Sequence, residues 1–322
     1  MELSLLFGGM AGWGFLVIVL SLDQVFGDPN YPLHPIRLIG KLLSFYETKL
    51  RFREADGFWG GVVLFFLLAF STLIPILIIN NLLEKIHPWL AQLWQLYIAY
   101  SMFALKDLSL HAQRVCEATE QGNLEAARHY SSMMVGRDTE KMDAHACNRA
   151  AIESVSENLT DGVISPLFYL LLFGVPGMVI FKIVSTMDSM VGYKTPKYIK
   201  FGSFGARFDD VLNWIPARLT WLLIVLVSLF HPNYSARKAW DIGLSQHALV
   251  PGPNSGWSET GAAGALSVQL VGPIWRNGNL DVNLWLGHPD DPQQLNANDV
   301  TRMNQLAAWV SFAFICLAFI LT

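Results

Sequence analysis

The sequence predicts an all-α, polytopic membrane protein with about five to six membrane segments, one of them broken or re-entrant, and with additional interfacial helices. Apolar residues make up 52% of the 322 residues and charged residues only 15%, whereas soluble domains carry about 25% charged residues. The uncharged runs of about 17–25 residues are long enough to cross a bilayer core. These observations exclude a soluble domain, a disordered chain and a secreted disulfide module.

Six segments are expected in the membrane, and they are 3–22, 61–81, 88–105, 163–184, 211–230 and 306–322. The first is expected to be an uncleaved helix, because no positive region precedes it. The fourth contains Gly174-Val175-Pro176-Gly177, which divides it into two pieces too short to cross alone. Since Lys and Arg gather in the polar segments on both sides, re-entry is favoured over a full crossing.

Two polar regions separate these segments. Region 106–162 is expected to be a mainly helical insertion, with a helix stop at Gly122 and a helix start at Asn123, residue types that suit helix ends. The expected helices are 106–121, 124–135 and 139–161. Region 231–305 is rich in Gly and Pro and is expected to be loop. The whole chain, 1–322, is expected to form a single integral, multi-pass domain of the cell membrane.

The helix that leads into the broken segment carries a row of charges at i+4 spacing, which places them on one helix face. The row consists of Arg149, Glu153, Glu157 and Asp161. The opposite face carries a row of small and apolar residues, which are Cys147, Ala151, Val155 and Leu159. Stacked carboxylates repel each other, so we expect a positive partner: Arg149, a substrate, or Mg²⁺. The alternative is a solvated face beside the bilayer.

Further charged groups lie at the ends of membrane segments. Asp23, Asp28, His34 and Arg37 follow the first segment, although a helix exit and a turn explain part of this pattern. Arg137 could bind phosphate, and Asp138 could cap the next helix. A dense group follows the broken segment, and it comprises Asp188, Lys194, Arg207, Asp209, Asp210, Asn213 and Arg218. Arg218 lies within an apolar stretch, where an Arg faces a cavity or partner, or extends to the headgroups.

The loop around Asn254 and Trp257 is rich in glycine and could cradle phosphate, although a plain loop before a short helix also explains it. It does not match a nucleotide-loop fingerprint, and the histidines do not form an HExxH pattern. The net charge of −4, without a large basic patch, excludes nucleic acid as the main partner.

Five stretches carry a resemblance to one family, and they are LDQVFGDPNYPLHPIRLIGKL (22–42), GRDTEKMDAHACNRAAIESVSENLTDGVISPLFY (136–169), DSMVGYK (188–194), FGSFGARFDDVLNWIPARLT (201–220) and PNSGWSETGAAGAL (253–266). Together they resemble the membrane-bound adenosylcobinamide-phosphate synthase (cobinamide synthase) family of cobalamin biosynthesis. The similarity runs in order over nearly the whole chain. The chain departs from the family at Ser185, where Asn is common, and at Ser267, where Gly is common.

The resemblance implies an ATP-dependent acid–amine ligase that joins aminopropanol, or its O-phosphate, to the free propionate carboxylate of adenosylcobyric acid. The cofactors so implied are ATP and Mg²⁺, and a corrinoid is the substrate. Within that reaction we expect catalytic roles for Glu153, Glu157, Asp161, His34 and Asp210. Substrate or phosphate binding is expected of Arg37, Arg137, Asp138, Asn158, Lys194, Arg207, Asn213, Arg218, Asn254 and Trp257. The expected metal ligands are Asp23, Asp28, Asp188 and Asp209.

These side chains come from distant stretches of the chain, and the expectation is that they gather in one pocket at one membrane surface. Two other functions stay open at this point. Charge within membrane segments and a broken helix also suit a transporter of a corrinoid or an ion. A non-catalytic scaffold for the pathway is the other. The lipid bilayer is an expected partner, and a homo-oligomeric assembly is left open.

Overall fold

The computed structural model describes residues 12–28 and 31–321. Its internal contacts divide the chain into two compact units. The first comprises Met1–Ala104, Ser165–Asn213 and Ala318–Thr322, and the second comprises Leu105–Ile164 and Trp214–Leu317. This division concerns contacts alone, so the expectation of a single integral membrane domain stays a prediction.

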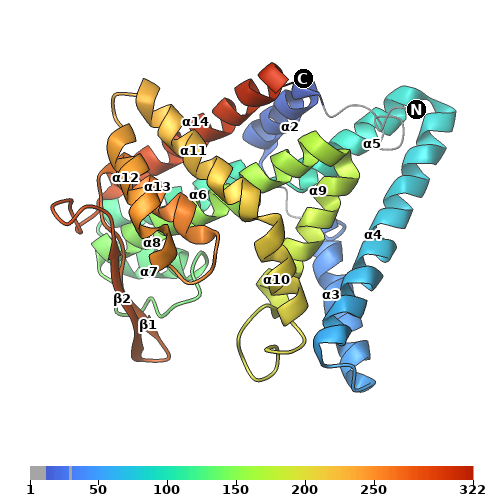
Figure 1. Ribbon diagram of the computed structural model, residues 1–322, viewed down its shortest axis with the longest axis horizontal. Coiled ribbons are helices and arrows are strands. Elements are labelled where there is room, and N and C mark those ends of the chain that lie inside the picture. Colours follow the sequence, from blue (N-terminus) through green and yellow to red (C-terminus); the bar gives the residue numbers. More distant parts are fainter. Residues whose placement is uncertain (1–11, 29–30, 322) are drawn as a thin grey trace. The chain divides into compact units, whose positions relative to one another are not determined.

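The first unit is a helical assembly around α9 (Figure 1). Its described helices are α2 (Trp13–Phe26), α3 (Pro35–Phe52), α4 (Phe58–Ile86), α5 (Pro88–Ser101), α9 (Ser165–Val191) and α10 (Ser203–Leu212). Helix α9 packs against each of the other five. Because its sequence is apolar nearly all round, α9 can bury several faces at once, which is the property of a central helix.

Helix α9 is interrupted at Gly174, where the backbone is not helical (φ 64°, ψ −163°). A positive φ is accessible to glycine at little cost, because glycine lacks a Cβ. Pro176 follows in the next turn and cannot supply a backbone N–H donor there. The predicted break at Gly174-Val175-Pro176-Gly177 is therefore confirmed, whereas re-entry stays a prediction.

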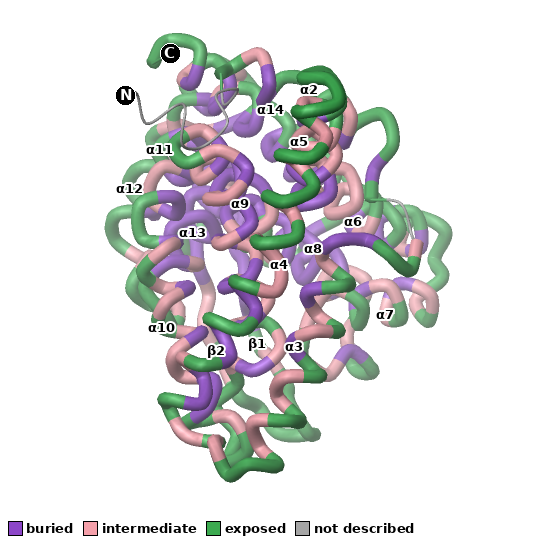
Figure 2. Tube along the Cα trace, turned by 90° about the vertical axis from the view of Figure 1, so that its right-hand side faces the viewer, coloured by how far each residue is buried: buried purple, intermediate pink, exposed green. Residues whose placement is uncertain are grey.

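The second unit surrounds a helix made largely of small residues. Its elements are α6 (Leu105–Glu120), α7 (Leu124–Ser132), α8 (Ala144–Asn158), the π-helix η1 (Leu159–Ile164), α11 (Trp214–Phe230), α12 (Ala236–Gln246), the 3₁₀ turn η2 (His247–Leu249), α13 (Ser255–Leu266), β1 (Leu270–Arg276), β2 (Asn279–Leu286) and most of α14 (Ala297–Leu321). Helix α13 is buried from Gly256 to Leu266 (Figure 2). It packs against α8, α11 and α12. A Cβ at Gly264 would lie 2.4 Å from the Lys238 carbonyl oxygen, so glycine permits this close approach to α12.

The helical hairpin predicted around Gly122 is confirmed. Gly122 has φ +68°, and the Asn123 side chain accepts a hydrogen bond from the Ala126 N–H at 3.1 Å. The third predicted helix begins at Ala144 instead of residue 139. Asp143 is its N-cap and accepts from the Ala146 N–H at 2.7 Å, so the interpretation of Asp138 as the cap was wrong.

The predicted packing face of α8 is also confirmed. Cys147, Ala151, Val155 and Leu159 are fully buried. Beyond Asn158 the chain continues as the π-helix η1, which contains Asp161. Such π-turns are frequent at functional sites. The first three residues of the predicted charged row therefore lie in the α-helix α8, and the last one, Asp161, lies in the wider π-helix η1.

Region 231–305 was predicted as loop, and this was wrong. It contains α12, α13 and an antiparallel β1–β2 hairpin with a bulge between Ile274 and Trp275. The described chain is therefore mainly helical, as predicted, but it also contains a two-stranded sheet that the predicted all-α class does not include. Asn277 (φ 52°) and Gly278 (φ 77°) form the hairpin turn. An Asn-Gly pair between apolar runs is a strong hairpin signal, but the many Gly and Pro residues nearby obscured it.

Three helical runs of the described chain are long and apolar enough to cross a membrane, and they are Phe58–Ile86, Ala144–Val191 and Ala297–Leu321. Helices Ser203–Leu212 and Trp214–Phe230 make a fourth if they form one broken span. The predicted count of five to six is not confirmed. Helix α5 has only 14 residues, or about 21 Å at 1.5 Å per residue. Helix α2 also has 14 residues, and the start of the predicted span 3–22 lies outside the described residues.

Candidate functional site

A cavity of about 380 Å³ lies in the second unit between α8, α13 and the β1–β2 hairpin. Four carboxylate residues and two arginines line it, and they are Glu153, Glu157, Glu259, Asp281, Arg137 and Arg276. Helix α8 contributes Glu153 and Glu157, whose i+4 spacing places them on one face. Helix α13 contributes Glu259. The cavity therefore joins a charged helix face to a buried acid from a distant part of the sequence.

Arg137 and Glu153 form a buried ion pair at this cavity. The Arg137 Nη2 lies 2.8 Å from the Glu153 Oε2, and the two side chains are 6% and 12% exposed. Arg137 Nε is buried and has no hydrogen-bond partner among the described residues. A buried guanidinium donor without a partner is unusual, because desolvating it is costly. Arg137 thus has binding capacity beyond its pairing with Glu153.

Side chains of α8 also hold the first residues of β1. The Val271 N–H donates to Glu153 Oε1 at 2.9 Å, and Arg149 Nε donates to the Val271 carbonyl at 3.1 Å. Val271 has φ 70°, which a β-branched residue rarely adopts and which persists only where the surroundings enforce it. Glu153 and Arg149 supply that enforcement, so the hairpin is fixed to the charged face of α8.

Glu259 is a candidate residue that the sequence analysis missed. Burial raises the pKa of this carboxyl well above its usual range, and repulsion from Glu157 and Glu153 adds to the effect. The protonated form is therefore favoured in the folded protein. A Glu within the otherwise uncharged stretch Ser255–Leu266 was the available signal, since an acid in a helix of Gly, Ala and Ser is rarely left without a role.

The cavity brings together three of the predicted residues, Arg137, Glu153 and Glu157. Glu157 is exposed, whereas the side chain of Glu153 is mostly buried. Asp161 is not among the lining residues. Asn158 is exposed, and its amide donates to the Ser154 carbonyl at 2.9 Å.

Asp138 has a structural contact in the same unit. Its carboxylate accepts a hydrogen bond from the Gly278 N–H at 2.8 Å, and its own N–H donates to the Trp275 carbonyl at 2.9 Å. Both bonds join the segment before α8 to the hairpin, so Asp138 fixes the position of Arg137, its neighbour in the chain.

Arg218 and Trp257 belong to an aromatic cluster of the second unit. The Arg218 guanidinium lies 4.2 Å from the ring centroid of Trp214 and 5.1 Å from that of Trp257. Trp257 stacks on His247 with ring centroids 3.7 Å apart, and Asn254 is buried at the start of α13. Arg218 thus faces aromatic partners within the protein, which agrees with the interpretation that it faces a partner.

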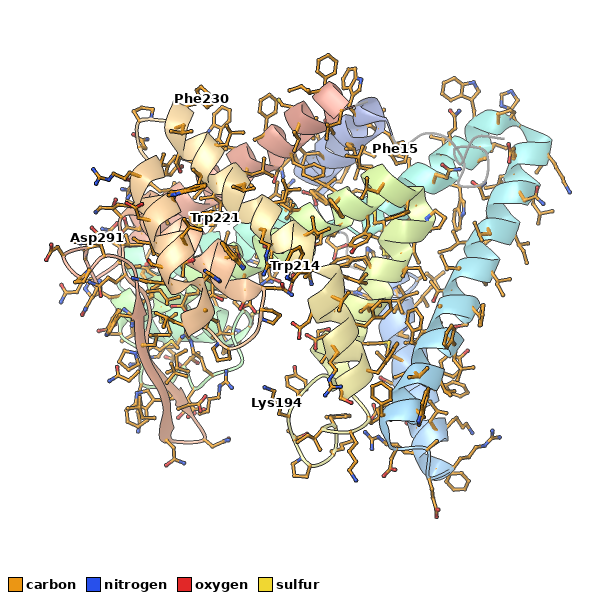
Figure 3. All side chains as sticks on the ribbon, in the orientation of Figure 1. Phe15, Lys194, Trp214, Trp221, Phe230 and Asp291 are labelled. Atoms are coloured by element: carbon orange, nitrogen blue, oxygen red, sulfur yellow. The ribbon has the colours of Figure 1, made fainter. Side chains whose placement is uncertain are left out.

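A second polar group lies in the first unit. Ser165 Oγ donates to Asn213 Oδ1 at 2.6 Å, and Asn213 Nδ2 donates to Asp209 Oδ2 at 2.9 Å. The carboxylates of Asp188 and Asp210 act electrostatically on Asp209, which is buried. Two predicted cations of this region, Lys194 and Arg207, are exposed; Figure 3 shows Lys194 in the loop between α9 and α10.

The remaining predicted residues lie at the end of α2, at the start of α3 and between the two helices, also in the first unit. His34 Nε2 lies 2.8 Å from Asp28 Oδ1, and His34 is nearly fully buried. Asp23 is buried and Arg37 is exposed. In residues 12–28 and 31–321, no three or more His, Cys, Asp or Glu side chains gather closely enough to hold a metal ion. The four metal ligands and the shared pocket stay predictions.

Comparison with known proteins adds independent information. The model of the CobD/Cbib protein family matches residues 16–307. The chain is 38% identical to "Cobalamin biosynthesis protein CobD" of Yersinia enterocolitica over 91% of this chain and 92% of the relative. It is 37% identical to CobD of Clostridium perfringens over 95% and 96%, respectively, and 36% identical to "Cobalamin biosynthesis protein CbiB" of Salmonella arizonae over 90% and 91%. No solved structure gives a significant match.

Proposed function

Because the chain belongs to the CobD/CbiB family of cobalamin biosynthesis proteins, we propose that it forms the amide bond that attaches aminopropanol, or its O-phosphate, to the free propionate carboxylate of adenosylcobyric acid. The product is adenosylcobinamide or its phosphate. The observation that carries the proposal is the cavity in which Glu153, Glu157 and Glu259 surround one space beside Arg137. Such a cavity suits a cationic amine.

An amine attacks an activated carboxyl group only in its neutral form, so the site needs a proton acceptor. Glu153 is engaged with Arg137 and with the Val271 N–H. We assign the acceptor role to Glu157, which lines the same cavity and is more exposed to solvent. Proton transfer by a positioned side chain typically contributes about 10²–10⁴-fold to a rate.

Glu259 has a different part in the proposal. Its burial favours the neutral acid, and a neutral carboxylic acid can donate a hydrogen bond at neutral pH. Beside the developing oxyanion, or beside the leaving oxygen, such a donor stabilises negative charge. Glu259 would thus act as the neutral acid of the site, while Glu153 stays paired with Arg137.

In the proposal ATP phosphorylates the carboxylate to an acyl phosphate with release of ADP, the amine then displaces inorganic phosphate, and Mg²⁺ would neutralise the phosphate charges. Mg²⁺ often binds through one or two carboxylates together with the phosphates of a substrate, and this mode does not require a cluster of protein ligands. The predicted residues of the first unit, among them Asp188, Asp209 and His34, stay in the proposal as binding or catalytic candidates. The apolar helices suit attachment to a cell membrane, which we propose as the location.

The test is amide formation by the full-length chain, purified in detergent. The protein is incubated with adenosylcobyric acid, MgATP and either aminopropanol or aminopropanol phosphate, and the corrinoid products are resolved by mass spectrometry. We expect a product whose mass corresponds to condensation with loss of water, dependent on ATP. If neither amine gives this product, the ligase proposal is wrong.

One observation favours transport as a second candidate. The kink at Gly174 interrupts an apolar helix, and broken helices frame the substrate sites of many transporters. A transporter of a corrinoid or an ion would not form the amide, whereas it would move a labelled corrinoid into sealed vesicles. A non-catalytic scaffold would do neither, so the two assays separate the ligase, a corrinoid transporter and a scaffold.

A further inference from the structure

The β1–β2 hairpin separates two cavities of the second unit. One face of the hairpin, with Ile274, Val282 and Leu284, lines the carboxylate cavity. A second cavity, of about 300 Å³, is lined by Pro273, Trp275 and Trp285 of the same hairpin. The alternation of side chains along a strand explains this division. The two cavities share Arg137 and Val271, and the second is not used in the mechanism above.

The lining of the second cavity is rich in cationic groups with aromatic support. Lys141 Nζ lies 5.2 Å from the centroid of the Trp275 ring, and the Arg149 guanidinium lies 4.8 Å from that of Trp285. Stacking of this kind fixes a cation without neutralising it. Arg137 is the third cation. The start of helix α8 also borders this cavity, and a helix N-terminus favours negative charge.

The acidic residues of the cavity are already engaged. Asp143 accepts from the Ala146 N–H at 2.7 Å, and Asp138 accepts from the Gly278 N–H at 2.8 Å. The remaining titratable group, His145, bonds through Nδ1 to the Leu295 carbonyl at 2.9 Å. These hydrogen bonds fix the two carboxylates but leave their negative charges in place, so an anion would be held by directed hydrogen bonds from the three cations and not by an excess of positive charge.

Arg137 has one side-chain donor that the described residues do not satisfy. Its side chain is only 6% exposed, yet its Nε donor has no partner among the described residues. Leaving such a donor buried and unpaired is costly. The Arg137 side chain also lines the cavity, and guanidinium groups bind phosphate oxygens through two parallel donors.

We propose that this second cavity is a phosphate-binding subsite, formed by Arg137, Lys141 and Arg149 behind the hairpin. It rests on the proposed function and deepens it. The bound phosphate belongs either to a nucleoside triphosphate or to a phosphorylated amino alcohol, and the cavity recognises the same phosphate group in both cases. Arg137 borders both cavities, so it links a bound phosphate on one side of the hairpin to the carboxylates on the other.

The test measures binding, not turnover. Isothermal titration calorimetry of the full-length protein in detergent, at low ionic strength, uses inorganic phosphate, ATP and aminopropanol phosphate as probes. Lys141→Gln removes an exposed cation of the cavity, so we expect this variant to fold as the unaltered protein does. We expect its Kd for at least one probe to rise roughly five- to thirtyfold, the ratio that corresponds to one or two kcal/mol. Lys141→Arg should restore the Kd to within about threefold, since a cation–π contact tolerates either cation.

The matched control is Arg114→Gln, which removes an exposed cation from α6 in the same unit. It should bind all three probes as the unaltered protein does. A change with ATP alone identifies the nucleotide as the source, and a change with aminopropanol phosphate alone identifies the amine. The proposal is overturned if the unaltered protein binds none of the probes, if Lys141→Gln binds all of them normally, or if Arg114→Gln weakens binding equally.

The same variants separate this inference from the proposed function. If the protein forms the amide but Lys141→Gln binds every probe normally, the subsite is wrong and the ligase proposal stands. If phosphate binding depends on Lys141 but no amide forms with either amine, the subsite stands and the ligase proposal is wrong.

Discussion

The buried ion pair between Arg137 and Glu153 allows a quantitative test of the carboxylate cavity. The pair is 2.8 Å long with side chains 6% and 12% exposed. Removing one partner of a buried pair typically costs 3–5 kcal/mol, because the other charge stays buried without compensation. Glu153 would keep the Val271 N–H as a donor, so we place Arg137→Met at the lower end, about 3 kcal/mol.

The reverse change, Glu153→Gln, keeps an acceptor for the Val271 N–H but leaves the guanidinium of Arg137 unpaired. We again expect a loss of about 3 kcal/mol in the free energy of unfolding. The double variant lacks the uncompensated charge that each single variant leaves behind, so it should lose about 3–4 kcal/mol, less than the sum of about 6 kcal/mol. The coupling energy should therefore reach about 2–3 kcal/mol.

The assay is urea unfolding of the detergent-solubilised protein, followed by tryptophan fluorescence, for the two single variants and the double variant. The exposed pair of Arg237 and Asp241, 3.6 Å apart with side chains 93% and 62% exposed, is the matched control. Its coupling energy should be at most about 0.5 kcal/mol. If the effects at Arg137 and Glu153 are additive, the two groups do not act as a buried pair and the reasoning is refuted.

Three other predictions concern strain, pH and packing. Val271→Gly should have about the same free energy of unfolding as Val271→Ala in the same assay. Glycine relieves the strain of the left-handed backbone, about 1–2 kcal/mol, and this offsets the stability that glycine usually loses relative to alanine. The control is buried Val268, whose φ is not positive; there the glycine variant should be less stable than the alanine variant by about 1 kcal/mol. The folded-state pKa of Glu259 lies above its unfolded value, so the stability that Glu259 contributes should fall as pH rises above about 4.3. The Glu259→Gln variant should lack that decline between pH 4.5 and 8. If the variant and the unaltered protein show the same pH profile, Glu259 is ionised in the folded protein. Gly243→Ala should lower the free energy of unfolding by about 1–3 kcal/mol, because the added Cβ would lie 2.0 Å from Trp221 Nε1; a gain in stability, the usual result of Gly→Ala in a helix, would contradict the packing of α12 on α11.

Local signals of the sequence located several helix ends and the break in α9. Gly122 and Asn123 ended and began helices where their residue types predict it, and Gly174 interrupted α9. The i+4 row through Cys147 was buried as its small and apolar residues predict, although Arg149 on the charged row is buried as well. These features depend on residues within a turn or two of each other, which is the range over which sequence spacing has structural meaning.

Features that depend on distant segments were not predictable in the same way. Glu259 became a candidate only because α13 packs against α8 and places it near Glu157. The hairpin brought Val271 to Glu153, 118 residues away in sequence. The Asn277-Gly278 turn was a usable signal that the glycine-rich surroundings concealed. Asp138 was predicted as the helix cap instead of Asp143 because both acids precede α8. Only the backbone conformation, which begins the helix at Ala144, identifies Asp143 as the cap.

The central claim is that the carboxylate cavity of the second unit handles the amine, and the turnover of Glu157→Gln tests it most directly. The amide isostere keeps the size of the side chain but cannot accept a proton as a base. The matched control, Glu140→Gln, changes an exposed carboxylate that lines neither cavity. We predict that amide formation falls by about 10²-fold or more in Glu157→Gln and stays within about twofold in Glu140→Gln, the range expected of a surface change. Normal turnover of Glu157→Gln, with Glu140→Gln also normal, would contradict the account.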